Sequence, residues 1–156
     1  MIIHDLTLLK NICLSTKTQW QKIWFTNWCF DIIHPGHIHT FKEAKKYCDI
    51  LIVAINGDIS PYWKTKPWRP IHDQQHRAII LDSMKYIDYV IFFDEETPII
   101  PISVILPDVL IKGWDYKAED VVWYQEIIAN WGKVIIIPTV EWYSTTNSVK
   151  KILDTK

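Results

Sequence analysis

The chain has 156 residues, with 17 lysines and arginines against 18 aspartates and glutamates, so its net charge is close to zero. That balance gives no basic excess to favour nucleic acid, and the length favours one domain with a proper hydrophobic core. No apolar run approaches membrane-spanning length, the N-terminus lacks a signal-peptide pattern, and the three cysteines lack metal-ligand spacing. We therefore expect a cytoplasmic protein with reduced thiols and no membrane or nucleic-acid partner.

The first third of the chain predicts a helix, a strand and a second helix. Residues 5–15 carry an apolar stripe at helical spacing, and we expect residues 1–20 to be a helical N-terminal extension of a single domain spanning 1–156. Ile23 to Thr26 is a short apolar strand. Residues 37–48 have apolar positions spaced for one buried helix face, so a turn must join this strand to this helix.

The remainder of the chain alternates strands with helices. We expect strands at 50–55, 89–93, 109–111 and 134–137. We expect helices at 73–86, where Asp73 can be the cap, at 97–106, at 119–130 and from a cap at 144–147 to about 153. This alternation predicts an α/β fold, a Rossmann-like parallel sheet with helices on both faces. Ligands of such sheets bind at the carboxyl ends of the strands, near the switch in strand order.

The segment 26–37, Thr-Asn-Trp-Cys-Phe-Asp-Ile-Ile-His-Pro-Gly-His, joins the first strand to the helix that follows it. His34 and His37 are three residues apart, and Gly36 lets the backbone approach a ligand where the helix points free N–H groups. Imidazoles can donate hydrogen bonds to phosphate oxygens as charge builds on the α-phosphorus of a nucleotide. Asp31 can orient one ring or help to hold a metal. The junction predicts a polyphosphate site, and its alternative is a plain turn with two surface histidines.

Cations gather on the loop at the same predicted edge. Lys64, Lys66 and Arg69 can bind a sugar phosphate or the β- and γ-phosphates of a nucleotide, and Arg77 follows on the next helix. The alternatives are a solvated basic loop and a surface ion pair.

Two further segments are candidates for nucleotide binding. One is a group of hydroxyls at a predicted helix N-terminus, where they form an anion site or an ordinary helix cap. The other follows the strand at 109–111 and can pack against a base or ribose, or merely connect two elements. The residues are Ser144, Thr145, Thr146, Lys112, Gly113 and Asp115.

Tryptophan is unusually common in this chain and glycine unusually rare. There are nine tryptophans and four glycines, and together they make about 8% of the chain, close to the roughly 7% that glycine alone usually takes. Several tryptophans stand where a loop favours glycine, as Trp68 does between Pro67 and Arg69. We hypothesise that many or all are glycines in the cellular protein, from a genome that reads UGA as glycine. The alternative is a genuinely tryptophan-rich protein.

The segment 25–37 resembles the signature of the cytidylyltransferase-like nucleotidyltransferases. Within that superfamily the chain most resembles the adenylyltransferase domain that makes ADP-heptose from heptose 1-phosphate. The similarity runs from Asp5 to Ile152 through matches that occur in order: Asn56-Gly57-Asp58, Arg69-Pro70, Arg77, Asp88, Thr97-Pro98, Pro107-Asp108, Lys112-Gly113, Asp115-Tyr116, Gly132 and Ser144-Thr145-Thr146-Asn147. The family has glycine at Trp28, Trp68, Trp114 and Trp142, and often at Trp20, Trp123 and Trp131, which also favours recoding.

The resemblance implies that His34 and His37 bind the triphosphate and stabilise the transition state, with Lys64 as a third catalytic group. It implies a sugar-phosphate site formed by Lys64, Lys66, Arg69 and Arg77. It further implies a set of nucleotide-binding residues: Cys29, Phe30, Asp31, His34, Gly36, His37, Lys112, Gly113, Asp115, Ser144, Thr145 and Thr146.

The implied activity is transfer of AMP from ATP, with Mg²⁺, to a sugar 1-phosphate, which is heptose 1-phosphate in the subgroup. Two alternatives stay open: a cytidylyltransferase for glycerol 3-phosphate or a similar alcohol phosphate, and a nucleotide-binding module without catalysis. The resemblance also implies a homodimer. Bifunctional relatives carry a sugar kinase domain ahead of this one, so we expect the kinase to be a separate protein or to be absent.

Overall fold

The computed structural model describes residues 1–66, 68–113, 117–121 and 123–138, together with residues 145, 149, 151, 152 and 154. Within these residues one parallel sheet has the strand order β1-β4-β3-β2-β5-β6. The strands are β1 (Ile2–Ile3), β2 (Ile23–Trp28), β3 (Ile50–Asn56), β4 (Tyr89–Phe93), β5 (Val109–Gly113) and β6 (Lys133–Ile137). The predicted α/β fold with a parallel sheet is therefore confirmed.

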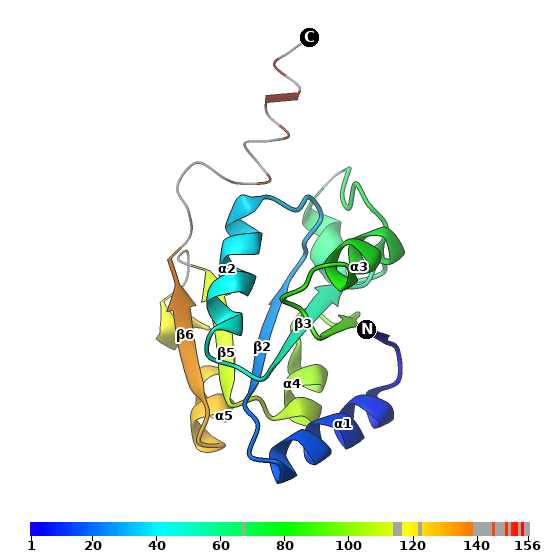
Figure 1. The fold of residues 1–156 in the computed structure, drawn as a ribbon. Coiled ribbons are helices and arrows are strands. Elements are labelled where there is room, and N and C mark those ends of the chain that lie inside the picture. The colour runs from blue at the N-terminus through cyan, green and yellow to red at the C-terminus, as the bar shows by residue number, and fades with distance from the viewer. Residues whose placement is uncertain are drawn as a thin grey trace.

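Helices cover both faces of the sheet (Figure 1). They are α1 (Leu6–Thr18), α2 (Pro35–Lys45), α3 (Gln74–Asp82), α4 (Ile99–Ile105) and α5 (Tyr124–Ala129), with the 3-10 helices η1 (Pro61–Thr65) and η2 (Ala118–Asp120). In the described part of the chain, no helix has both the length and the apolar character needed to span a membrane.

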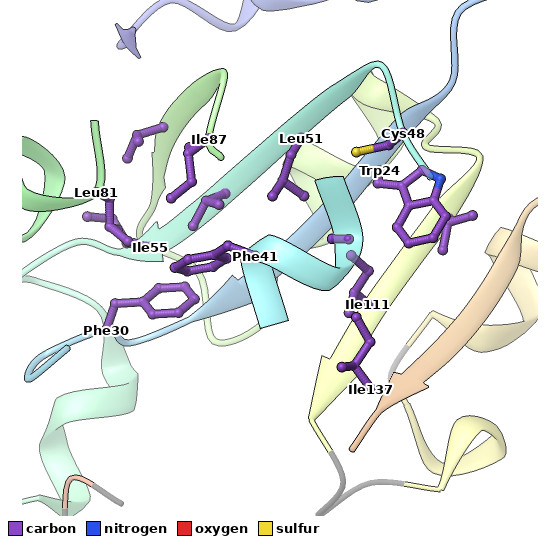
Figure 2. Packing of buried hydrophobic residues seen from close by; sticks show 14 of the residues in the cluster. Trp24, Phe30, Phe41, Cys48, Leu51, Ile55, Leu81, Ile87, Ile111 and Ile137 are labelled. Atoms are coloured by element: carbon purple, nitrogen blue, oxygen red, sulfur yellow. The ribbon is translucent and has the colours of Figure 1, made fainter. Parts of the chain in front are cut away.

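One face of the sheet is buried beneath α2 and α3. Phe41 of α2 and Leu81 of α3 are almost fully buried over the apolar side chains of β3, such as Ile55. Figure 2 shows Phe41 beside Phe30, and their ring centroids are 5.4 Å apart. Phe30 lies in the segment that leads from β2 to α2, so the core contacts this segment directly.

The other face is covered by α1, α4 and α5. Leu9 and Cys13 of α1, Ile105 of α4 and Ile127 of α5 are buried against Phe25 and its neighbours in the sheet. Burial raises the pKa of the Cys13 thiol to about 11, so it stays protonated and acts as a small apolar side chain. Both faces of the central strands are thus buried away from water, which explains why these strands are continuous runs of apolar residues.

Strand β2 occupies the position where the strand order reverses. It pairs with β3 on one side and with β5 on the other, and β4 and β6 lie beyond them. In an open parallel sheet, the crevice outside the carboxyl ends of the strands at this point is the usual ligand site. The carboxyl ends of β2 and β5 meet there, because Asn27 and Lys112 line the same cavity.

Residues 1–20 differ from the predicted helical extension. The helix is present as α1, but Ile2 and Ile3 also pair with Val90 and Ile91 of β4 and add a strand to the sheet. The segment is therefore part of the sheet and its core. A strand of two residues has no detectable period, which is why the sequence did not predict it.

Other boundaries shift by a few residues. Asp73 caps α3 as predicted, with its carboxylate accepting the N–H of His76 at 2.9 Å. The helix predicted at 97–106 is confined to α4, and the one predicted at 119–130 is split into η2 and α5. The last predicted helix lies largely outside the described residues.

Candidate active site

The turn after β2 leads directly into α2. His34 is the N-cap residue, with extended backbone, and Pro35 begins the helix. Proline suits this position because its fixed φ is helical and its missing N–H has no partner to lose. In the first turn of α2, the N–H of His37 donates to the carbonyl of His34 at 2.9 Å. The N–H of Gly36 has no partner among the described residues, so it can receive an anion at the helix N-terminus.

The two histidines form one stacked pair. Their ring centroids are 3.7 Å apart with an angle of 23° between the rings. The backbone N–H of His34 donates to Nδ1 of His37 at 3.3 Å. A neutral His37 ring that accepts at Nδ1 carries its proton on Nε2, where it can serve as a donor.

Both imidazoles are uncharged at neutral pH. Burial lowers the pKa of His34. Burial, with the neighbouring His34 ring as a second cause, lowers the pKa of His37 to about 3. Nδ1 of His34 is buried without a hydrogen-bond partner among the described residues. A buried polar atom without a partner costs free energy, so a bound ligand that bonds to it would be favoured.

Phe30 fixes one side of this pair. Its ring is 3% exposed and meets the His37 ring edge-on, with centroids 5.1 Å apart. Its backbone is left-handed, with φ of 46°. Such a conformation is strained for a bulky residue and persists only where the surroundings enforce it, as the buried ring does here.

Asp31 points into the protein and bonds to the loop before α3. Its carboxylate is fully buried, accepts from Nη1 of Arg69 at 2.7 Å, and accepts the N–H groups of Ile71 and His72 at 2.8 and 3.1 Å. Both oxygens thus have interior partners. The structure gives Asp31 and Arg69 a role in holding this loop against the turn, which differs from the predicted contacts with nucleotide and sugar phosphate.

Arg77 is also an interior residue. Its side chain is 0% exposed and donates to the carbonyl oxygens of Cys29 and His72 at 2.8 and 3.0 Å and to Asp58 at 2.8 Å. These interior contacts differ from the predicted contact with a substrate phosphate, which stays a prediction. A guanidinium whose donors are taken up in the core positions the Cys29 turn and is not presented to a ligand.

The predicted lysines have different surroundings. Lys64 lies exposed on η1. Lys66 bonds to the hydroxyl of Tyr62 and lies over its ring. Lys112, at the end of β5, donates to Oδ1 and to the carbonyl of Asn27 at 2.8 and 3.2 Å, so its ammonium lies at the end of β2.

Other predicted residues are only partly covered by the structure. Gly36 is buried in the first turn of α2, and Gly113 pairs with Ile137 at the end of β5. The hydroxyl of Thr145 donates to the carbonyl of Ile32 at 3.3 Å, next to the histidine turn. Asp115, Ser144 and Thr146 lie outside the described residues.

A cavity of about 220 Å³ lies at the carboxyl ends of β2 to β5. Its lining includes Asn27, Trp28, Cys29, Asn56 and Lys112. Ligand pockets usually measure about 300 Å³ or more, so this one is small for a nucleotide. The indole of Trp28 is part of its wall, and a glycine at this position would enlarge it.

Asn27 and Asn56 were missed by the sequence reasoning. Each is buried at the end of a central strand, with 8% and 5% exposure. Asn27 holds Lys112, and Nδ2 of Asn56 donates to Ser60 at 3.3 Å. In the sequence, each is a polar residue near the end of an otherwise apolar strand, and this pattern could have indicated them.

Curated relatives match most of this chain. It is 43% identical over 148 residues to the bifunctional protein HldE of Actinobacillus succinogenes, which covers 95% of the chain and 31% of the relative. It is 42% identical over 144 residues to the protein of the same name from Cronobacter sakazakii, and the match covers 92% of this chain and 30% of the relative. The chain thus spans about three tenths of the length of these relatives.

Solved structures share the fold. A lipopolysaccharide core biosynthesis protein from Thermoplasma volcanium GSS1 superposes with a TM-score of 0.62 at 25% identity, covering 79% of this chain and 99% of the other. A second structure is a pantoate-beta-alanine ligase from Francisella tularensis, complexed with a form of ATP and beta-alanine. It gives a TM-score of 0.67 at 20% identity, and the match covers 96% of this chain and 72% of the other.

The model of one protein family matches residues 25–151, which contain the stacked histidines, the buried ion pairs and all strands from β3 to β6. The matched range covers most of the chain and confirms the family predicted from the sequence. The chain belongs to the cytidylyltransferase-like family.

Proposed function

We propose that the chain is a nucleotidyltransferase that transfers AMP from ATP to a sugar 1-phosphate, with heptose 1-phosphate as the acceptor. The observation that carries this proposal is the neutral, stacked pair of His34 and His37 at the start of α2, with a buried nitrogen left without a partner. Membership of the cytidylyltransferase-like family and 42–43% identity to proteins named HldE support it.

The reaction is an in-line displacement at the α-phosphorus. A phosphate oxygen of the sugar 1-phosphate attacks, a new P–O bond forms, and the bond to the β-phosphate oxygen breaks, so that pyrophosphate leaves. No covalent intermediate with the protein is needed. Catalysis then consists of positioning the reactants and stabilising charge that develops on the phosphate oxygens.

The histidine pair supplies hydrogen-bond donors to that charge. Nε2 of His37 carries the proton and can donate to an α-phosphate oxygen, and the N–H groups at the start of α2 add a fixed positive potential. A neutral imidazole costs less to bury than a cation, so the pair can be kept ready in the absence of ligand. When phosphate groups bind, their negative charge favours the protonated form of both imidazoles.

Lys64 and Lys66 are proposed to bind the phosphates that face η1. Lys112 is proposed to bind the nucleotide at the end of β5. A nucleotide that reaches from the cavity beside Lys112 to the start of α2 passes over Cys29. The hydroxyls of Ser144, Thr145 and Thr146 stay proposed ligands of the β- and γ-phosphates. Thr145 supports this proposal through its bond to Ile32 beside the histidine turn.

Mg²⁺ is proposed to enter with ATP. The described residues include no group of three or more histidine, cysteine, aspartate or glutamate side chains that could hold a metal ion. An ion bound through phosphate oxygens and water, with few protein ligands, fits this surface. Such an ion would neutralise charge on the departing pyrophosphate.

The wider setting is also a proposal. We propose a cytoplasmic enzyme that works as a homodimer. The expected separate sugar kinase gains no support from the relatives, because each is a single chain named as bifunctional.

Pyrophosphate release tests the activity. We expect release from ATP with heptose 1-phosphate, and little from CTP with glycerol 3-phosphate. The assay compares the chain as written with a variant carrying Trp28→Gly, Trp114→Gly and Trp142→Gly, which we expect to turn over faster because position 28 narrows the cavity. Preference for CTP would identify a cytidylyltransferase, and no release from either protein would indicate a binding module.

The histidine pair is tested by single substitutions. His34→Ala and His37→Ala should each lower kcat by a factor on the order of 10² or more, with a modest loss of ATP binding, because their hydrogen bonds strengthen in the transition state. Steady-state kinetics and direct ATP titration separate the two effects. Turnover close to that of the unsubstituted protein in both variants would refute the assigned role.

Arg77 and Lys64 should respond in opposite ways. Arg77→Met leaves the carbonyl oxygens of Cys29 and His72 and one oxygen of Asp58 without this donor, so we expect the free energy of unfolding to fall by about 1–3 kcal/mol. Lys64→Ala removes an exposed cation and should lower turnover while unfolding changes by less than about 0.5 kcal/mol. Urea unfolding and kinetics of both variants test this. A stable Arg77→Met protein that has lost only phosphate affinity would restore the original prediction.

The lowered pKa of His37 also makes stability depend on pH. Below its ordinary pKa of about 6.5, the ring takes up a proton in the unfolded chain but stays neutral in the folded chain down to about pH 3. The unfolded state then binds more protons, so the free energy of unfolding falls as the pH drops through this window, by up to about 1.4 kcal/mol per pH unit. Urea titrations at pH 7 and pH 5 measure it. His37→Gln should flatten the slope, and an unchanged slope would contradict the account.

A further inference from the structure

Four tryptophans have a left-handed backbone. The φ angles are 58° at Trp20, 68° at Trp68, 79° at Trp123 and 63° at Trp131. Side chains with a Cβ atom rarely adopt such angles, and a bulky residue there is a strong outlier, whereas glycine adopts them freely. Only Phe30 and Leu106 share the feature among the described residues, and none of the chain's own glycines does.

Trp20 and Trp131 each end a helix in the same way. After α1, the N–H of Trp20 donates to the carbonyl of Lys17 and that of Gln21 to the carbonyl of Thr16. After α5, the N–H groups of residues 131 and 132 repeat the pattern, donating to the carbonyls of residues 128 and 127. This pair of bonds defines the Schellman motif, and its left-handed position is usually glycine.

Trp68 and Trp123 each occupy the third position of a tight turn. The N–H of Arg69 donates to the carbonyl of Lys66 at 3.2 Å, and that of Tyr124 to the carbonyl of Val121 at 2.9 Å. At Trp123 the angles of 79° and 11° match the third residue of a type II turn. A positive φ at this position is the reason that such turns take glycine.

Most of these side chains gain nothing from packing that could offset the strain. Trp20, Trp68 and Trp131 are 93%, 94% and 96% exposed. Phe30 differs, because its left-handed backbone places a ring in the core. Trp123 is partly buried against the core, so its assignment rests on the turn geometry and not on exposure. Exposed indoles on glycine-type backbone serve no visible purpose.

Trp24 and Trp63 differ from these four residues because both are buried and make specific contacts. Trp24 lies in β2, is 6% exposed and stacks on Tyr47. Trp63 is 8% exposed, and its indole N–H donates to the carbonyl of Gly57 at 2.8 Å. Neither has a positive φ.

We propose that residues 20, 68, 123 and 131 are glycine in the protein that the cell makes, and that Trp24 and Trp63 are true tryptophans. The structure thereby sorts these six of the nine tryptophans by backbone conformation, which composition alone cannot do. The simplest route is a UGA codon read as glycine at the four left-handed positions, with UGG at Trp24 and Trp63.

Peptide mass spectrometry of the protein made by its own organism, together with the codons, tests the assignment directly. We expect glycine and UGA at positions 20, 68, 123 and 131, and tryptophan and UGG at positions 24 and 63. Tryptophan at the first four positions, or glycine at either of the last two, would overturn it.

Thermal unfolding gives an independent test. Each of Trp20→Gly, Trp68→Gly, Trp123→Gly and Trp131→Gly should raise the Tm by roughly 2–4 °C, because strain at positive φ is relieved. Trp24→Gly and Trp63→Gly should lower it by about 6 °C or more through lost core packing.

Trp20→Ala and Trp131→Ala are the matched controls. Alanine removes the exposed indole but keeps a Cβ atom, so its gain should be smaller than that of glycine. If alanine raised the Tm as much as glycine does, the exposed indole and not the backbone conformation would be the source of the instability. That result would contradict the argument from φ. No gain with glycine would contradict it as well.

Discussion

The site depends on two buried charges that fasten the turn after β2 to the loop before α3. Asp31 and Arg77 both lack solvent exposure, and a buried charge is tolerated only where its hydrogen bonds are made within the protein. Asp31 takes its partners from residues 69–72, and Arg77 donates to the carbonyl of Cys29. The backbone between β2 and the histidine pair is therefore held from two sides.

The hydrophobic core extends this support to the imidazoles. Phe41 of α2 packs on Phe30 (Figure 2). Phe30 in turn packs edge-on against His37. The same burial lowers the pKa of His37 and leaves Nδ1 of His34 without a partner. The packing of Phe30 and Phe41 thus contributes both to the core and to the placement of the histidine pair.

Local patterns predicted much of this structure, and long-range contacts were beyond them. Continuous apolar runs located β3 and β4, and the cap at Asp73 located the start of α3, because those signals lie within a few neighbouring residues. The pairing of Asp31 with Arg69 joins residues far apart in the chain, and nothing in either local sequence indicates it. Arg77 was therefore predicted as a phosphate ligand, although tertiary packing buries it. The tryptophans at positive φ mark places where sequence and backbone disagree, and the backbone conformation indicates glycine there.

The central claim is that the paired imidazoles at the start of α2 receive the phosphates of a nucleotide. The most direct measurement is a crystal structure with an ATP analogue whose α,β-bridge cannot be cleaved. The account predicts α-phosphate oxygens within hydrogen-bond distance of Nε2 of His37 or Nδ1 of His34, with the base near the ends of β2 and β5. A nucleotide bound elsewhere, or phosphates that contact neither ring, would contradict it.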